Sequence, residues 1–343
     1  MGKAITICDI AREAGVSIST VSRVLTGSAR VKEDKKKRIS DIIGKYDFHP
    51  NLLARGLIRT KTRQIGIITD DVCNPYYSAL FVSCERAADA LGYTILLSDS
   101  FGEREKEFRL LEKMVSQRVD ALILIGGLVD GLVTDTEFAE RVNLVTNQIP
   151  VIVTGRLDGT SCSRVNVDGN RAMELVMEYL TSCRYKKIAF AGGSPAVKFT
   201  TDLRAAYRKL LKSYGLAYVP EFDVQNEQYD ASGGYEAMSQ LLNQKKLPDA
   251  VIAVNDCTAA GVVRAIKERN FRIPEDIGVV SFDDTYIASL MTPQLTSVGC
   301  NYDEYGQNII RSAVSAIAGN TIPHETLIEP ELAVRSSCCV LES

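Results

Sequence analysis

The first 46 residues carry apolar positions at the spacing of three short amphipathic helices. In the first helix these positions recur at i, i+3, i+4 and i+7, which puts them on one face. The second helix has a narrower apolar stripe, and the third runs from about residue 32 to residue 46. The apolar positions are, helix by helix, Ile7, Ile10, Ala11 and Ala14; Val21, Val24 and Leu25; and Ile39, Ile42 and Ile43. Together they are enough to enclose one small core.

Polar residues and a glycine mark where the first two helices begin and end. Thr6, with Asp9 three residues later, has the pattern of a capping box. Gly15 tolerates the positive φ that a sharp turn requires, and Ser17 is a good N-cap for the next helix. Two short helices joined in this way have the layout of a helix-turn-helix, although an ordinary helical hairpin shares it.

Charge separates this N-terminal head from the rest of the chain. Residues 1–63 contain 14 Lys and Arg against 6 Asp and Glu, a net charge of +8, whereas the remainder contains 26 against 37, a net of −11. A basic head on an acidic body favours DNA binding, because basic residues neutralise phosphates and release their counterions. Ile18, Ser19, Ser22 and Arg23 face away from the apolar stripe of the second helix, where they can reach base edges. The basic run at 35–38 is also compatible with a plain solvated helix face.

The segment from residue 48 to residue 63 differs from both of its neighbours. Pro50 ends the third helix and Asn51 can cap a new one, but a helix of about two turns is too short to be stable alone in water. Ala54 and Leu57 lie three residues apart on one face, among four basic residues. A small residue beside a leucine wedge suits insertion into a DNA minor groove, and a simple basic linker is the alternative.

From residue 64 onward, short apolar runs typical of buried parallel strands alternate with helical segments. Strands are expected at 65–69, 93–97, 121–125, 151–154, 165–167, 188–191, 250–254 and 277–282, and helices at 80–91, 103–117, 170–180, 203–214, 235–242 and 259–269. This alternation predicts two doubly wound α/β units. Ligands of such units bind beyond the carboxyl ends of the strands, and a cleft between two units brings both sets of loops together.

Composition narrows the remaining choices. A chain of 343 residues allows two or three domains, and no apolar run approaches the roughly 18 residues that cross a membrane. The N-terminus lacks a secretory apolar segment. Nine cysteines without a CxxC pair and two histidines, His49 and His324, argue against a disulfide framework, a zinc site or histidine-assisted catalysis. The glycine pairs at 126–127 and 192–193 lack the spacing of a nucleotide-binding loop, so we expect neither an enzyme nor a bound cofactor.

Motifs from Ile5 to Arg335 resemble the lactose-repressor (LacI) family of bacterial transcription regulators. They are, in order, residues 9–17 with 20–25, Tyr46 with Pro50-Asn51, Ala54-Arg55 and Leu57, Asn74-Pro-Tyr-Tyr77, Asn255-Asp256 with Ala259 and Gly261, and Phe282-Asp-Asp284 followed by Pro293 and Leu295-Thr296. The resemblance implies an N-terminal all-α helix-turn-helix domain and an α/β core of two doubly wound subdomains, like periplasmic binding proteins of type I. It also implies a homodimer in the bacterial cytoplasm, on the nucleoid, whose heads read the two halves of a near-palindromic, double-stranded operator.

The resemblance assigns DNA contacts to the head and to the segment after it. Ile18, Ser19 and Arg23 match the positions that read the major groove, and Arg23 has the fork that pairs with a guanine edge. Ala54 and Leu57 match the packing residue and the intercalating leucine of the hinge. The positions that meet phosphates or begin helices are matched by Thr6, Ser17, Thr20, Ser22, Thr26 and Arg30.

In the core, the resemblance places a small effector among loops that follow the strands. The residues that match its contacts are Asp70, Tyr76, Tyr77, Arg156, Asn255, Asp283 and Tyr302. Carboxylates, amides, an arginine and tyrosine rings suit a sugar, but Asn255 and Asp283 could equally cap the segments that follow them. Leu203 stands where the family has an arginine, so either Arg204 takes over that contact or the contact is lost, and Cys300 replaces a frequent glutamine. These departures indicate an unusual effector, a sugar or a sugar acid.

The expected organisation is a helix-turn-helix domain at 1–50, a hinge at 51–63 and an effector-binding and dimerisation core at 64–343. Within the core, the N-subdomain is expected at about 64–163 and 296–324, and the C-subdomain at about 164–295 and 325–343. The chain end has no leucine heptad of the kind that makes tetramers. The expected function is a repressor of carbohydrate-use genes that a sugar-like effector switches. A solute receptor without DNA function and a regulator controlled by a phosphoprotein corepressor remain as alternatives.

Overall fold

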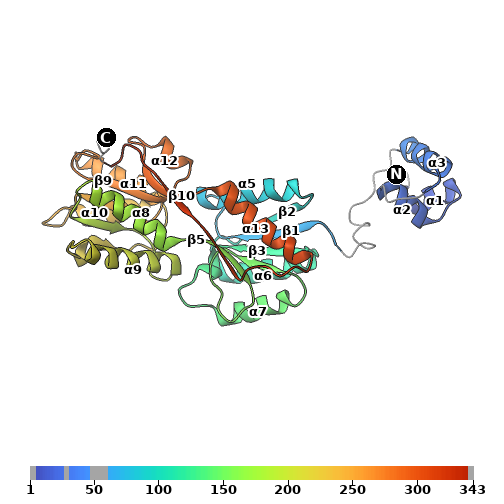
Figure 1. The fold of residues 1–343 in the computed structure, drawn as a ribbon, viewed down its shortest axis with the longest axis horizontal. Coiled ribbons are helices and arrows are strands. Elements are labelled where there is room, and N and C mark those ends of the chain that lie inside the picture. Colours follow the sequence, from blue (N-terminus) through green and yellow to red (C-terminus); the bar gives the residue numbers. More distant parts are fainter. Residues whose placement is uncertain (1–4, 27–30, 47–60, 339–343) are drawn as a thin grey trace. The chain divides into compact units, whose positions relative to one another are not determined.

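The computed structural model of the chain describes residues 5–26, 31–46 and 61–338. These residues belong to two compact units, a head and a core, which divide between Thr62 and Arg63 (Figure 1). Within the described ranges, no helix is both long enough and apolar enough to cross a lipid bilayer.

The head consists of three helices around one small core, as the apolar spacing predicts. They are α1 (Ile7–Ala14), α2 (Ile18–Thr26) and α3 (Glu33–Lys45). The predicted capping box is formed, because Asp9 N–H donates to the Thr6 hydroxyl at 3.4 Å and Thr6 N–H donates to the Asp9 carboxylate at 3.0 Å. Gly15 ends α1 in the left-handed region, at φ 67°. The buried centre of the head is made of Ile10, Ala11, Ala14, Val21, Ile39 and Ile42.

The first lobe of the core is a six-stranded parallel sheet in the order β11-β5-β4-β3-β1-β2. Its strands are β1 (Gln64–Thr69), β2 (Thr94–Asp99), β3 (Ala121–Ile125), β4 (Val151–Val153), β5 (Ser163–Val167) and β11 (Glu325–Ile328). One face is covered by α5 (Pro75–Ala90) and α13 (Tyr302–Ile317), and the other by α6 (Arg104–Ser116) and α7 (Thr136–Thr146) (Figure 1). Both faces are therefore buried, as the continuous apolar runs of its central strands require.

The second lobe is a six-stranded sheet in the order β12-β10-β9-β8-β6-β7. Its strands are β6 (Ile188–Ala191), β7 (Asp223–Val224), β8 (Ala250–Ala253), β9 (Gly278–Asp283), β10 (Thr296–Cys300) and β12 (Pro330–Ala333), of which only β12 is antiparallel to its neighbour. Helices α8 (Gly169–Ser182) and α9 (Lys198–Ser213) cover one face, and α10 (Ala231–Leu242) and α11 (Asp256–Glu268) cover the other. The short α12 (Tyr286–Leu290) follows β9, and the 3-10 turns are η1 (Gly127–Asp130) and η2 (Pro220–Phe222).

The chain passes between the lobes three times, after β5, after β10 and after β11, and at each passage the structure departs from the expected boundaries. Strand β5 belongs to the first sheet, although residues from 164 were expected in the second subdomain. Strand β10 belongs to the second sheet, although 296–324 were expected in the first, and β11 pairs with β5 instead of joining the second subdomain. Each of these strands lies just before a crossing, and its sheet is decided by pairing with residues far away in the sequence. Figure 1 shows β5 and β10 running through the junction of the lobes.

Candidate functional site

The predicted DNA-reading residues lie together on α2. Ile18 is 44% exposed, and Ser19 and Arg23 are also exposed. The Ser17 hydroxyl accepts a hydrogen bond from Thr20 N–H at 3.3 Å, so it begins α2 as expected. Helix α2 thus presents one apolar, one hydroxyl and one guanidinium side chain outward, the kinds of group that read a major groove. The side chain of Thr26, together with Arg30, Ala54 and Leu57, lies outside the described residues.

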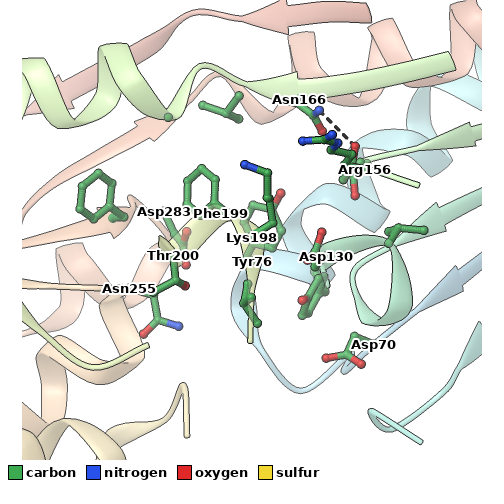
Figure 2. A pocket seen from close by; sticks show the side chains of 18 of the residues that line it. Asp70, Tyr76, Asp130, Arg156, Asn166, Lys198, Phe199, Thr200, Asn255 and Asp283 are labelled. Carbon is green, nitrogen blue, oxygen red and sulfur yellow. Dashed lines mark hydrogen bonds between the residues drawn. The ribbon is translucent and has the colours of Figure 1, made fainter. Parts of the chain in front are cut away.

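A cavity of about 790 Å³ lies between the two lobes of the core, at the carboxyl ends of their strands. Its volume is in the usual range for a small-molecule site. Seven of the eight predicted effector residues line it, namely Asp70, Tyr76, Tyr77, Arg156, Asn255, Asp283 and Tyr302. Figure 2 shows Asn255 and Asp283 on one side of the cavity and Asp130 and Arg156 on the other. A ligand in this space therefore touches both lobes.

Arg204 is the predicted residue that the structure places elsewhere. Its guanidinium donates to the Val224 carbonyl at 2.9 Å, bonds to the Gly192 carbonyl and pairs with the Asp223 carboxylate. Only 3% of the residue is exposed, because it lies against the core of the second lobe. Leu203 is buried in that core as well, so neither residue supplies the arginine contact that the family resemblance implies.

Three carboxyl groups enter the cavity without a neutralising partner. Asp70 follows β1, Asp130 ends η1 and Asp283 ends β9. Oδ1 of Asp70 is buried without a hydrogen-bond partner, and no described residue donates to the carboxyl group of Asp130 or of Asp283. Burial, with the charge of Asp70 nearby, raises the pKa of Asp130 to about 7. Burial, with the charge of Asp256, raises the pKa of Asp283 well above its ordinary value.

A fourth carboxyl group lies at the base of the η1 loop. Glu107 is 3% exposed and accepts a hydrogen bond from Leu128 N–H at 3.1 Å. A Cβ at Gly127 would lie 2.6 Å from its Oε2, so the glycine at this position lets the loop descend onto Glu107. Burial raises the pKa of Glu107 to about 8, which keeps this carboxyl protonated at neutral pH. The loop that carries Asp130 is therefore anchored to α6 through Glu107.

Aromatic rings form one wall of the cavity. Tyr76 meets Tyr77 edge to face with ring centroids 5.2 Å apart, and it meets Tyr302 in the same way at 6.1 Å. The Tyr302 hydroxyl donates to the carbonyl of Asp283 at 2.9 Å, which joins α13 to the end of β9. Phe199, at the start of α9, is 40% exposed and adds an apolar surface on the second lobe. Rings of this kind suit the apolar face of a sugar ring.

Asn255 and Asp256 shape the wall that the second lobe contributes. Asn255 caps α11, because its Oδ1 accepts from Thr258 N–H at 2.7 Å, and its Nδ2 donates to the Tyr229 carbonyl at 3.0 Å. The capping alternative is thus realised, and one N–H of the amide remains for a ligand. Asp256 lies beneath and accepts hydrogen bonds from Ser281, Thr285 and Ser297. This network fixes the turn after β9, where Asp283 has φ 94°.

Several residues that line the cavity were not predicted from the sequence. Asp130, Asn166, Lys198, Phe199 and Thr200 all reach the cavity (Figure 2). Each stands at or after the end of a strand in the region where ligands of doubly wound sheets bind, which is a signal the sequence contains. Lys198, Phe199 and Thr200 were missed because the apolar spacing predicts that the helix after β6 begins at residue 203. In the structure this helix begins at residue 198.

The described residues contain no cluster of three or more His, Cys, Asp or Glu side chains that could hold a metal ion. The eight cysteines within the same ranges are free thiols. Cys300 lines the cavity, and burial raises the pKa of its thiol to about 12. It is therefore a neutral, weakly polar group at the cavity wall.

Known proteins match the chain along most of its length. Residues 6–51 match the bacterial regulatory proteins of the lacI family, and residues 177–338 match the periplasmic binding protein-like domain. Catabolite control protein A of Staphylococcus epidermidis is 32% identical over 299 residues, which are 86% of this chain and 87% of that protein. The same protein of Priestia megaterium is 32% identical over 296 residues, with the same coverage.

Solved structures show the same architecture. The lac repressor dimer bound to operator and the anti-inducer ONPF has a TM-score of 0.88 at 25% identity, covering 98% of this chain and 100% of that chain. The complex of the transcriptional regulator CelR with cellobiose has a TM-score of 0.73 at 24% identity, covering 97% and 100%. The predicted fold, a helix-turn-helix head with two parallel-sheet subdomains, is confirmed. The chain belongs to the lacI family of bacterial regulatory proteins.

Proposed function

We propose that the protein is a homodimeric repressor that binds a double-stranded operator and is switched by a small, sugar-like effector. One observation carries the proposal: the same chain joins a helix-turn-helix head to a cavity of about 790 Å³ between two lobes. The lac repressor structure with operator and anti-inducer, and the CelR structure with cellobiose, support both halves of it. Operator binding would place the protein on the nucleoid, in the cytoplasm, and the site has no need of catalytic chemistry.

In this proposal, the head determines which sequence is bound. Ile18, Ser19 and Arg23 read base edges, with Arg23 pairing with a guanine. The residues that fix the register on the phosphates or begin helices are Thr6, Ser17, Thr20, Ser22, Thr26 and Arg30. Ala54 and Leu57 of the hinge enter the minor groove, and pairing of two hinges across the dimer orders them on DNA.

The cavity determines when the operator is bound. A ligand that touches Asp70 and Asp130 of the first lobe and Asn255 and Asp283 of the second favours one relative position of the lobes. An effector shifts a conformational equilibrium only by the difference in its affinity for the two states. Contacts to both lobes provide that difference if the lobes change their relative position about the three chain crossings.

The experiment that tests the proposal is selection of binding sites from random DNA by the full-length protein, followed by a mobility-shift titration. We expect a near-palindromic site, and we expect Arg23→Ala to relax base preference at one position in each half. Arg264→Ala is the matched control, because this arginine lies outside the head, on the surface of the effector-binding unit, where it pairs with Glu268. Unchanged selectivity of the Arg23 variant contradicts its assigned role, and failure to select any site favours a solute receptor.

The hinge gives a second readout. We expect Leu57→Ala to weaken operator binding while leaving the affinity for the effector unchanged. Equal loss of both affinities contradicts the hinge assignment. Operator binding that no small sugar alters would favour the alternative of a phosphoprotein corepressor.

A further inference from the structure

The cavity between the lobes is lined by more carboxyl groups than basic groups. Eight of its lining residues carry carboxyl groups, namely Asp70, Asp71, Glu107, Asp130, Asp168, Asp202, Asp283 and Glu325, whereas four are basic, namely Arg104, Arg156, Arg164 and Lys198. Walls of low dielectric strengthen such a field inside a cleft. The charge of a ligand is therefore a strong determinant of whether it binds here.

Each of the four basic side chains already lies beside a protein carboxylate, although the buried Nε of Arg164 makes no hydrogen bond. Arg156 donates to Asp158 at 2.6 Å, and Lys198 donates to Asp202 at 2.6 Å. The other two are paired as well, Arg164 with Glu325 at 3.8 Å and Arg104 with Asp135 at 2.7 Å. A phosphate or carboxylate ligand would have to compete with protein carboxylates for Arg104, Arg156 and Lys198, which leaves Arg164 Nε as the one unsatisfied cationic donor among the described lining residues.

The carboxyl groups show the opposite pattern. Asp70, Asp130 and Asp283 receive no ion pair from any described residue, and Oδ1 of Asp70 is buried without a hydrogen-bond partner. Asp70 and Asp130 are near enough for the charge of one to raise the pKa of the other. All three carboxyl groups line the same cavity, and so does Tyr77.

A protonated amine in the cavity would pair with these carboxyl groups. An ammonium group donates three hydrogen bonds, and its positive charge would compensate the negative charge of two neighbouring carboxylates. The tyrosine rings also attract cations to their faces. Hydroxyl groups alone would satisfy lone pairs but would leave the carboxylates uncompensated, and an anionic ligand would add repulsion. The regulatory role of the cavity rests on the proposed function, whereas the chemical class of its ligand follows from the lining residues.

We propose that the effector is a hydroxylated amine in its protonated form, such as an amino sugar, held between Asp70 and Asp130 with its hydroxyl groups toward Asn255 and Asp283. The site discriminates against carboxylated and phosphorylated sugars. This replaces the sugar acid that the missing arginine at position 203 suggested.

The test is calorimetric titration of the full-length protein with matched sets of hexoses. The probes are glucosamine, galactosamine and mannosamine, their neutral parents, their N-acetyl derivatives and the corresponding 6-phosphates and uronic acids. We expect at least one amino sugar to bind about tenfold or more tightly than its parent and its N-acetyl derivative, because only the ammonium group can pair with the buried carboxyl groups of Asp70 and Asp130. The proposal is overturned if no amino sugar binds, or if a neutral, acetylated or anionic probe binds equally well.

Variants locate the amine. Asp130→Asn should abolish the preference for the amino sugar, and Asp70→Asn should weaken it if the ammonium lies between the two carboxylates. Asp276→Asn is the control, because this carboxylate does not line the cavity and pairs with Arg272 at 2.9 Å. Thermal unfolding without ligand is measured first; removal of a buried, unpaired charge should not lower the melting temperature. An amine preference that survives in both cavity variants contradicts the proposed placement.

The same samples separate this inference from the proposed function. If a neutral sugar binds best and releases the selected operator, the regulatory function stands and the amine inference fails. If the amino sugar binds as expected but the protein selects no DNA site, the ligand inference stands and the regulatory function fails.

Discussion

Replacing Asp256 with alanine should destabilise the second lobe and displace Asp283 from the cavity. Asp256 is 1% exposed, and its carboxylate is the shared acceptor of four hydrogen bonds. Ser281 Oγ donates at 2.6 Å and Ser297 Oγ at 2.8 Å, while Thr285 donates from N–H at 2.6 Å and from Oγ1 at 2.8 Å. These bonds tie β9, β10 and the turn between β9 and α12 to the first turn of α11.

The expected loss is about 3–5 kcal/mol, because four hydrogen bonds to one buried carboxylate are lost and hydrogen bonds to charged groups contribute about 1.5–3 kcal/mol each before the cost of burying the charge is subtracted. The amide of Thr285 cannot turn to another acceptor, and each buried donor left unsatisfied costs about 1–3 kcal/mol. The turn it anchors contains Asp283 and Asp284 at φ 94° and 47°, where non-glycine residues are strained. Without the anchor, this turn is free to relax toward ordinary backbone angles.

Asp256→Asn should cost only about 1 kcal/mol, the typical value of one hydrogen bond. Its carbonyl can accept both bonds from Thr285, and its N–H groups can donate to the two serine hydroxyls, which also accept. Ser281→Ala removes one donor and leaves none unsatisfied, so it is the control for lost packing. The measurements are urea unfolding followed by circular dichroism and hydrogen exchange at the Thr285 amide. An asparagine variant as unstable as the alanine variant, or an alanine variant within about 1 kcal/mol of the parent, would refute the reasoning.

Two further predictions concern charge and packing. The pKa of Glu107 is about 8, compared with 4.5 for an ordinary glutamate, so the folded protein keeps a proton that the unfolded chain releases. The free energy of unfolding should therefore fall as the pH rises from about 4.5 to about 8, by about 1.4 kcal/mol per pH unit at most. Glu107→Gln should reduce this slope in thermal unfolding at pH 5, 6.5 and 8, with Asp130 still contributing below about pH 7, and an unchanged slope counts against it. Gly261→Ala should destabilise the core by about 1–3 kcal/mol or more, because its Cβ would lie 1.9 Å from the carbonyl oxygen of Ala231. Gly44→Ala, with no atom within 4 Å of the new Cβ, should instead stabilise the head by about 0.5–1 kcal/mol, and equal effects of the two variants would contradict the packing argument.

Local structure was predictable wherever neighbouring residues decide it. The capping box at Thr6 and the left-handed turn at Gly15 depend on groups within a few residues, and both form as predicted. The central strands of both sheets are apolar on both faces, so their positions could also be read from the sequence. Strands β5, β10 and β11 were assigned to the wrong lobe because their partners are distant in the chain, and a short apolar run carries no information about its sheet.

The cavity was predictable in location but not in charge. Residues that follow strands were identified through the family resemblance, and seven of them line the cavity. The sequence predicted that Arg204 contacts the effector, but its side chain could turn either toward a ligand or toward the protein interior. In the structure it turns toward the interior, where it pairs with the Asp223 carboxylate. The pairing of Arg156 with Asp158 and of Lys198 with Asp202 decides the charge that a ligand meets, and such pairings depend on side-chain directions that only the fold provides.

The central claim is that a ligand between the lobes controls the affinity of the head for DNA. The most direct test is fluorescence anisotropy of the selected operator, titrated with full-length protein with and without a saturating concentration of the tightest-binding amino sugar. We predict an operator Kd that rises about tenfold or more with ligand, and a smaller change for Asp130→Asn at the same ligand concentration, because this variant loses one partner of the ammonium group. An operator Kd that is the same with and without saturating ligand would contradict it.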